Sequence, residues 1–259
     1  MIEIIEKIKK NKTPCYFISP HLDDAVFSAG SLMQDLSNHT KVVVINVFTM
    51  PSKPPYTLSA KRFLRQCKYK DPLLLFAVRQ KEDAKVLQQI GTTVINLPYE
   101  DSIWRKLQNP NLILTILGKV FAEFIHIYPI YRLHIQPGKI SAHDKDLMNK
   151  ITEDLTKIIN PESFIFCPVG IGQHNDHLLV REVVVNSFNN VIMWTDFPYI
   201  LNSKTSTDVE NYTKISLPTN KNIKKRLIKG YKSQVKAIFE NKNIEIPDEV
   251  FYFPEYMIL

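Results

Sequence analysis

The chain has few cysteines, and no two of them are spaced as in a metal-binding or redox motif. Among its 259 residues, only Cys15, Cys67 and Cys167 are cysteines, and they lie far apart. An odd number of cysteines without a CxxC pair is not a disulfide framework, which argues against a small secreted scaffold. We therefore expect free thiols and a reducing compartment.

Long hydrophobic runs are also missing. A membrane-spanning helix needs about 20 consecutive apolar residues, but residues 112–128 are interrupted by Lys119, Glu123 and His126. The first residues, MIEIIEK, alternate charged and apolar side chains and lack the apolar centre of a signal peptide. We expect a cytoplasmic protein without a membrane span.

Charge is ordinary in amount but unbalanced in sign. Lys and Arg number 33 against 26 Asp and Glu, giving a net charge of +7, and 44% of residues are hydrophobic. An excess of positive charge could attract an acidic partner, for example through the lysines of residues 221–239. These lysines are not accompanied by a nucleic-acid motif, so we expect a solvated face and no nucleic-acid partner. The sequence does not distinguish a monomer from a homo-oligomer.

Segments typical of strands and helices alternate along the chain. Short apolar runs predict strands at residues 15–19, 41–48, 92–97, 131–135, 163–168 and 191–195. Apolar residues at helical spacing predict helices at residues 2–10, 24–36, 73–90, 101–107, 111–128, 144–159, 178–185 and 221–239. The remaining segments are predicted to be a loop at 49–72, which contains four prolines, an irregular stretch or hairpin at 208–218, and a packed aromatic tail at 251–256.

This alternation predicts an α/β fold. Strand, helix and strand in succession are typical of parallel sheets with helices on both faces. We expect a Rossmann-like three-layer sandwich with a mostly parallel central sheet. Because no linker or repeat interrupts the chain, residues 1–259 are expected to form a single domain.

Two polar segments lie shortly after two of the predicted strands. Residues 20–24, PHLDD, follow the strand at 15–19, and residues 174–177, HNDH, follow the strand at 163–168. The carboxyl ends of parallel strands lie at one edge of a sheet, where open α/β sheets bind ligands. We therefore expect the two segments to meet there.

Imidazole and carboxylate groups in these segments are suitable ligands for a metal. Catalytic zinc sites use three protein ligands and keep one position for water, and His21, Asp24 and His177 supply such a set. Asp23 is then placed to act as general base. Taken alone, Asp24 could be only a helix N-cap and Asp23 only a solvated residue, but the matched segments favour the metal site.

The second segment offers two further catalytic candidates. A protonated His174 could stabilise an oxyanion or protonate a leaving amine, and Asp176 could orient an imidazole. His143 and Asp144 could form a spare ligand pair, but capping of the following helix by Asp144 is the simpler interpretation. The other histidines are expected to be structural or on the surface: His39, His126 and His134.

These segments resemble the PHxDD and HxDH signatures of the PIG-L/LmbE-like deacetylases. Three weaker similarities occur in the same order as in that family: Arg79-Gln80-Lys81-Glu82 to its RxxE segment, Asp101-Ser102 to its Asp-Ser pair, and Tyr231-Lys232-Ser233-Gln234 to its Tyr-x-Ser-Gln segment. The resemblance implies a Rossmann-like fold and a zinc-dependent hydrolase that removes N-acetyl groups from N-acetylglucosamine-type sugars or glycoconjugates.

Residue roles follow from the resemblance. It implies that His21, Asp24 and His177 bind Zn²⁺, or another divalent metal such as Fe²⁺. It also implies that Asp23 is the base and that His174 stabilises the oxyanion.

Substrate contacts are implied less directly. The resemblance implies that Arg79 and Asp101 bind the hydroxyl groups of the sugar. Their plainer interpretations are an exposed intrahelical pair of Arg79 with Glu82 and an N-cap at Asp101. Tyr199 could form a wall of the site or be a packed surface tyrosine.

Other functions use the same residues. A hydrolase of another acyl, carbamoyl, ester or phosphoester bond would need the same ligands. A non-catalytic sugar-binding protein is a rival of another class, and the presence of both the base and the ligands argues against it.

Overall fold

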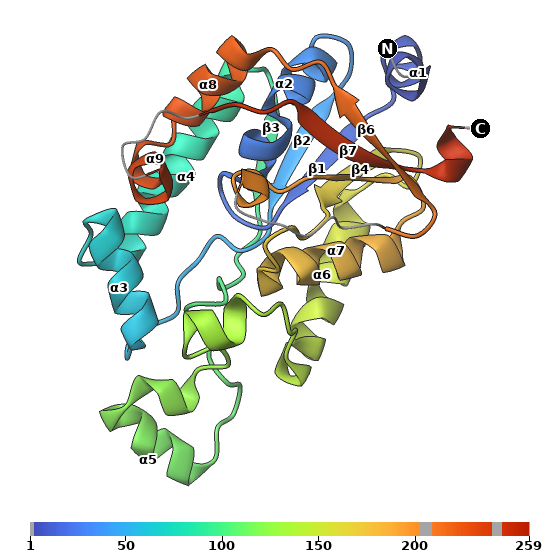
Figure 1. Ribbon diagram of the computed structural model, residues 1–259. Helices are drawn as coiled ribbons and strands as arrows, with labels where there is room; N and C mark the ends of the chain where they lie inside the picture. The colour runs from blue at the N-terminus through green and yellow to red at the C-terminus, as the bar shows by residue number, and fades with distance from the viewer. Residues whose placement is uncertain (1–2, 202–208, 240–244, 259) are drawn as a thin grey trace.

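A seven-stranded sheet forms the centre of the molecule (Figure 1). The computed structural model describes residues 3–201, 209–239 and 245–258. Within these residues the strand order is β3-β2-β1-β4-β5-β7-β6; β1 to β5 are parallel, and β7 pairs antiparallel with both β5 and β6. The strands are β1 (Cys15–Ser19), β2 (Val42–Asn46), β3 (Thr93–Asn96), β4 (Phe164–Pro168), β5 (Val191–Trp194), β6 (Tyr212–Leu217) and β7 (Glu249–Pro254). The predicted α/β fold with a mostly parallel sheet is confirmed.

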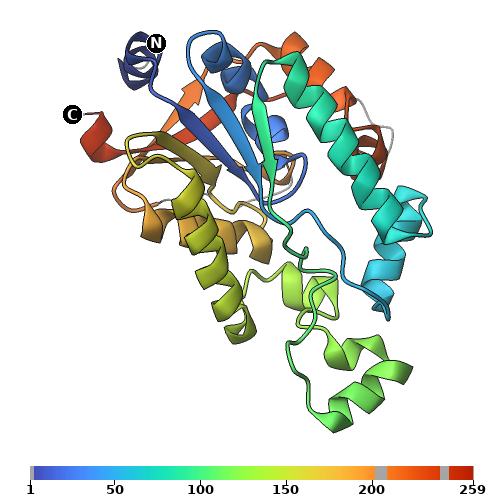
Figure 2. The same ribbon diagram turned by 180° about the vertical axis from the view of Figure 1, so that it is seen from behind.

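Helices cover both faces of this sheet, with α4 on one side and α6 and α7 on the other (Figures 1 and 2). The first face packs against α1 (Glu3–Asn11), α2 (Asp24–Ser37), α4 (Pro72–Gln89), α8 (Lys221–Lys229) and α9 (Lys232–Phe239). The second packs against α6 (Lys145–Ile158) and α7 (Asn175–Ser187). Side chains of a strand alternate between faces, so Phe17 lies in the first core and Ile18 in the second.

The chain reverses its direction across the sheet beside β1. From β1 it proceeds outward to β2 and β3, and it then returns to place β4 and β5 on the other side of β1. The loops after β1 and β4 therefore diverge at the carboxyl edge of the sheet. This arrangement is the switch point at which open α/β sheets bind ligands.

The predicted loop at residues 49–72 contains a helix, α3 (Leu58–Cys67). The Thr57 side chain accepts a hydrogen bond from the Ala60 N–H group and caps this helix. Leu64 and Cys67 pack into a third apolar cluster beside α4. The prolines lie outside α3, and Pro72 opens α4. The loop prediction was therefore wrong for these ten residues.

Residues 101–135 differ most from the predicted secondary structure. Residues 101–107 form turns and not a helix. The predicted helix at 111–128 ends early as α5 (Leu112–Val120), and a 3₁₀ turn follows at Ala122–Ile125. The predicted strand at 131–135 is a single π-helical turn, and its Ile135 is buried in the third cluster.

The C-terminal region completes the sheet. The predicted helix at 221–239 is divided into α8 and α9 near Gly230, where a Cβ atom would lie 2.3 Å from Val86. The aromatic tail packs on the body as β7, as expected. Tyr212–Leu217 form β6, which pairs with β7 instead of forming a local hairpin, while Asp208 lies outside the described residues. The described helices include none with the length and apolar character needed to cross a membrane.

Candidate active site

The two polar segments meet at the carboxyl edge of the sheet. His21 follows β1, Asp24 opens α2, and His177 lies in the first turn of α7. All three are buried, and one ligand atom from each lies within 4.8 Å of the other two. The Asp24 Oδ2 atom is 3.0 Å from His21 Nδ1 and 3.3 Å from His177 Nε2.

Side-chain hydrogen bonds close the turn between β1 and α2. Ser19 Oγ donates to the His21 carbonyl oxygen and accepts from the Ala25 N–H group. The Asp24 carboxylate accepts from the His21 N–H group at 2.9 Å, so it faces back towards His21. Asp23 occupies the N-cap position but makes no capping hydrogen bond. The interpretation of Asp24 as only a helix cap is therefore wrong.

Each of the two imidazoles also contacts a second carboxylate. His21 Nε2 is 3.1 Å from Asp176 Oδ2, and His177 Nδ1 is 2.7 Å from Asp196 Oδ1. Asp196 also accepts two backbone N–H groups from the loop after β4. Histidines that bind a metal through one ring nitrogen commonly donate a hydrogen bond from the other ring N–H group to a carboxylate. The nitrogens that face Asp24 are thereby left available for a cation.

A buried arginine holds Asp176 in place. Arg105 donates to Asp176 Oδ1 at 2.6 Å and to Asp144 Oδ2 at 3.0 Å, and the Ser102 N–H group donates to Asp176 Oδ2. Burial would raise the pKa of Asp176, but the Arg105 charge and the hydrogen bond to His21 hold it well below its usual range. Asp144 makes no capping hydrogen bond, so its prediction as a helix cap was wrong.

The charge balance around Asp24 favours a cation. Burial would lower the pKa of His177, but the Asp24 charge and the hydrogen bond with Asp196 raise it to about 9. Burial likewise opposes protonation of His21, yet Asp176 and Asp24 raise its pKa well above the usual value. His177 Nε2 is buried and makes no hydrogen bond within the described part of the chain. Two imidazoles and a carboxylate with these properties fit a divalent metal ion.

Asp23 lies beside this cluster and contacts Arg79. Its Oδ1 atom is 3.5 Å from Arg79 Nη2, and both side chains are buried. Burial raises the pKa of Asp23 to about 6, while Arg79 opposes the rise and Asp24 adds to it. Arg79 is only 3% exposed, so the alternative interpretation as an exposed pair with Glu82 is wrong.

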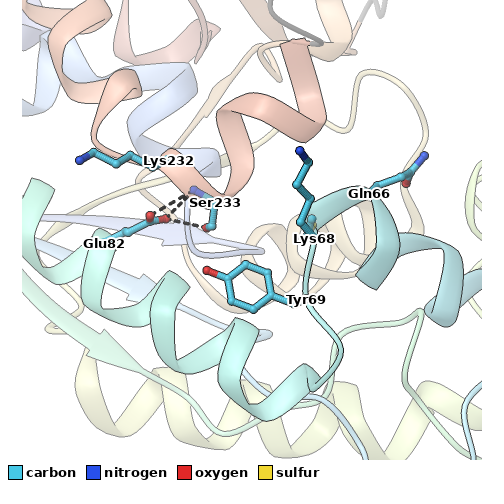
Figure 3. Close-up of a pocket in the computed structure, with 7 residues that line it drawn as sticks. Gln66, Lys68, Tyr69, Glu82, Lys232 and Ser233 are labelled. Carbon is cyan, nitrogen blue, oxygen red and sulfur yellow. Dashed lines mark hydrogen bonds between the residues drawn. The ribbon is translucent and has the colours of Figure 1, made fainter.

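Two of the three segments with weaker family resemblance also come together. Glu82 of α4 accepts hydrogen bonds from the Ser233 N–H and Oγ–H groups (Figure 3). Next to this pair, Tyr231 donates a hydrogen bond to Asp83 at 2.7 Å. These contacts join α4 to the start of α9 and hold the helix that carries Arg79. The Glu82–Ser233 pair also lines a separate pocket of about 440 Å³ that contains none of the predicted site residues.

His174 lies against both metal-ligand candidates. Its ring centroid is 5.1 Å from that of His21 and 5.2 Å from that of His177, and its Nδ1 atom is buried without a hydrogen bond among the described residues. Burial and the neighbouring charges of His21 and His177 lower its pKa to about 3. The protonated form considered from the sequence is therefore disfavoured.

Asp101 and Tyr199 also lie at the site. Asp101 Oδ2 is 3.7 Å from His21 Nε2, while its Oδ1 atom accepts the Ile103 N–H group and closes a turn. The Tyr199 ring centroid is 5.4 Å from that of His177. Gly172 has a φ of +86°, and a Cβ atom there would lie 2.6 Å from the Tyr199 ring, so this close packing needs glycine.

Sequence reasoning missed three residues of this site. Asp196, directly after the predicted strand at residues 191–195, was not assigned to the site, and neither was Arg105. Tyr131, whose ring centroid is 6.0 Å from that of His174, was assigned to a strand. The position of Asp196 directly after a buried strand was the one available signal, because the other two residues lie in irregular segments.

Comparisons with known proteins agree with this geometry. A family model of PIG-L, described as GlcNAc-PI de-N-acetylase, matches residues 16–188. No curated protein matches the chain. The deacetylase–teicoplanin complex of teicoplanin biosynthesis has a TM-score of 0.72 at 21% identity and covers 93% of this chain and 98% of its own. The zinc-inhibited form of teicoplanin deacetylase Orf2 gives 0.71 at 21% identity, with coverage of 93% and 97%.

A further similar structure is the A40926 pseudoaglycone deacetylase Dbv21, with a TM-score of 0.65 at 19% identity and coverage of 94% and 97%. At these identities the structural likenesses show a shared fold. The family match extends from β1 to the end of α7, covers more than half of the chain, and includes both polar segments. The chain therefore belongs to the PIG-L family.

Proposed function

We propose that this protein is a zinc-dependent hydrolase that removes an N-acetyl group from an N-acetylated amino sugar or glycoconjugate. The observation that carries the proposal is the buried cluster of His21, Asp24 and His177 with Asp23 beside it. Membership of the PIG-L family supports this choice over other hydrolytic reactions.

The metal ligands would be His21 Nδ1, a carboxylate oxygen of Asp24 and His177 Nε2. Asp176 and Asp196 would fix the orientation and tautomer of the two imidazoles. A divalent cation at this position supplies Lewis-acid polarisation of the acetyl carbonyl and lowers the pKa of a water molecule. Zinc suits two imidazoles and a carboxylate, and Fe²⁺ accepts similar ligands.

Asp23 would act first as general base and then as general acid. Its pKa of about 6 leaves it ionised at neutral pH but still basic enough to accept a proton from the attacking water. The carboxylic acid formed can then protonate the leaving amine, which returns Asp23 to its starting state. Arg79 would keep the carboxylate oriented between these steps.

His174 would stabilise the developing oxyanion in its neutral form. Because its pKa is lowered to about 3, the contribution is a hydrogen bond from a ring N–H group and not a full charge. Asp101 would accept hydrogen bonds from sugar hydroxyls, and Tyr199 would form a wall of the substrate site.

The test is acetate release from a panel of N-acetylated amino sugars by zinc-loaded protein. We expect release from at least one sugar, and Asp23→Asn should reduce it by about 100-fold or more while zinc stays bound. Asp146→Asn changes an exposed carboxylate on α6 and is the matched control. Aryl esters and phosphates test the rival reactions. Unchanged release by Asp23→Asn, or hydrolysis of esters or phosphates alone, would contradict the proposal.

A further inference from the structure

An exposed apolar surface lies on the segment that contains α5. Within α5 only Gly118 is buried, while Leu112 is 74% and Val120 is 73% exposed. We call this surface the apolar tip, and its members are Leu112, Ile113, Ile116, Leu117, Val120, Phe121, Phe124, Ile130 and Leu133. Many large exposed apolar side chains gathered in one segment are typical of a binding site.

The apolar tip is held by local contacts and does not pack on the sheet. The Asn111 side chain caps α5 by accepting the Leu114 N–H group. Gly118 faces Ile125 so closely that a Cβ atom would lie 2.4 Å from its side chain. Figure 1 shows α5 projecting below the body, and in Figure 2 the arrowheads of β2 and β3 point towards this same side. The helix therefore packs one small face locally and leaves its larger side chains outside.

The charges of this segment indicate what covers the apolar tip. Between residues 112 and 140 the chain has three basic residues and one acidic residue, Glu123. The Glu123 carboxylate accepts the Leu58 N–H group, whereas Lys119, Arg132 and Lys139 are exposed. Exposed apolar side chains interspersed with basic residues are typical of elements that lie in an anionic lipid interface. A second copy of this chain, with its net charge of +7, would bring charge of the same sign.

We propose that the apolar tip inserts into the headgroup region of an anionic lipid surface. Lys119, Arg132 and Lys139 would contact lipid phosphates around the inserted side chains. The nine residues of α5 extend about 13 Å, so the helix would lie in the interface and not span the bilayer. Tyr131 is adjacent to Ile130 and contacts His174, so lipid binding would place the candidate active site beside the membrane surface. Lipid binding by the apolar tip does not require the proposed chemistry.

The test is sedimentation of the full chain with lipid vesicles. One set contains phosphatidylcholine with phosphatidylglycerol, and the other contains phosphatidylcholine alone. We expect binding to the mixed vesicles that is about tenfold weaker with phosphatidylcholine alone and falls with added salt. The double variant Leu112→Asp/Val120→Asp should weaken binding by about tenfold or more.

Two further variants make the result specific. Lys119→Gln/Arg132→Gln should weaken binding to the mixed vesicles and remove most of the difference between the two lipid compositions. Val185→Asp introduces an acid at a 40% exposed apolar position on α7 and should bind as the unaltered chain does. Circular dichroism and thermal unfolding would verify that each variant is folded.

Three outcomes would overturn the proposal. The first is no sedimentation of the unaltered chain with mixed vesicles. The second is equal binding by the folded Leu112→Asp/Val120→Asp variant. The third is absence of vesicle binding together with a dimer that the same variant abolishes, which would assign the apolar tip to a second copy of the chain.

Discussion

Arg105 connects the candidate metal cluster to the rest of the protein. It is 4% exposed and lies between two carboxylates, Asp176 and Asp144. Its guanidinium carbon lies 4.7 Å from the centroid of the Phe48 ring, and this cation–π contact helps to hold the guanidinium group in place. Because Asp176 contacts His21, the position of Arg105 determines how firmly one proposed ligand is oriented.

Replacing Arg105 with methionine should therefore affect both stability and metal binding. Two buried carboxylates would lose their compensating charge, which costs about 3–5 kcal/mol of unfolding free energy. The loosened Asp176–His21 contact should lower zinc affinity by about 10- to 100-fold. Arg105→Lys should rescue only part of either loss, because an ammonium group cannot bind both carboxylates in the same geometry. Denaturant unfolding and zinc titration measure the two effects, and unchanged values in Arg105→Met would contradict this role.

The raised pKa of Asp83 should make the stability of the protein depend on pH. Burial raises its pKa to about 7, against the opposing hydrogen bonds from Tyr231 and Asn46. A carboxyl whose pKa is higher in the folded than in the unfolded state contributes stability at low pH. That contribution is lost as the pH rises from the unfolded-state pKa, about 4, through about 7.

Asp83→Asn removes this titration. We compare the unfolding free energy of the variant with that of the unaltered chain. This difference should shift in favour of the variant by about 1–3 kcal/mol between pH 5 and pH 8. Urea unfolding of both proteins at the two pH values measures the change. A difference that is the same at pH 5 and pH 8 would show that Asp83 does not titrate in this range.

The break in α2 is stabilised by a side chain from the far end of the sequence. Ala29 has non-helical dihedral angles, with φ −131° and ψ 16°. Just beyond it, the Ser31 and Leu32 N–H groups donate to the Glu249 carboxylate at 2.8 and 3.0 Å. Lys224 of α8 lies 3.2 Å from the same carboxylate, and both side chains are buried. One carboxylate thus joins α2, α8 and β7.

Removing this carboxylate should destabilise the fold strongly. Glu249→Ala leaves the Lys224 ammonium and two N–H groups without their partner, and we expect a loss of about 3–5 kcal/mol in denaturant unfolding. The double variant Lys224→Met/Glu249→Leu should lose less, because no buried charge remains. A single variant as stable as the unaltered chain would show that water replaces the carboxylate at this position.

The sequence predicted the parallel strands and their helices better than the irregular connections. Buried strands such as β1 and β4 have continuous apolar runs that identify them directly. The helix α3 was missed because prolines flank it, although none lies within it. The pairing of β6 with β7 could not be predicted, because it joins segments separated by two helices and depends on tertiary contacts.

The site was predictable where chemistry coincided with a strand end. The predicted meeting of PHLDD and HNDH at one sheet edge is confirmed, while their catalytic roles stay predictions. Arg105 carried no such signal, because its partner Asp144 lies 39 residues away in sequence and was interpreted as a helix cap. Burial of an arginine is a property of the folded chain and cannot be inferred from its neighbours in sequence.

The folded protein as a whole should respond to the proposed metal. A ligand present at 100 times its dissociation constant stabilises the folded state by about 2.7 kcal/mol, which raises Tm by about 5–10 °C for a chain of this size. We predict that Zn²⁺ produces such a shift in a single cooperative transition and that chelation reverses it. His177→Ala should abolish the shift, and Mg²⁺, which prefers oxygen ligands, should not produce it. An equal Zn²⁺ shift in His177→Ala would contradict the proposed ligand set.

The three free thiols can report how the protein opens. Cys15 and Cys167 are fully buried in β1 and β4, while Cys67 at the end of α3 is 7% exposed and borders the pocket of Figure 3. Burial raises the pKa of Cys15 to about 12 and that of Cys67 to about 11, so reaction requires exposure to solvent. Alkylation followed by mass spectrometry should therefore modify Cys67 first, when α3 opens locally, and the other two only when the sheet separates.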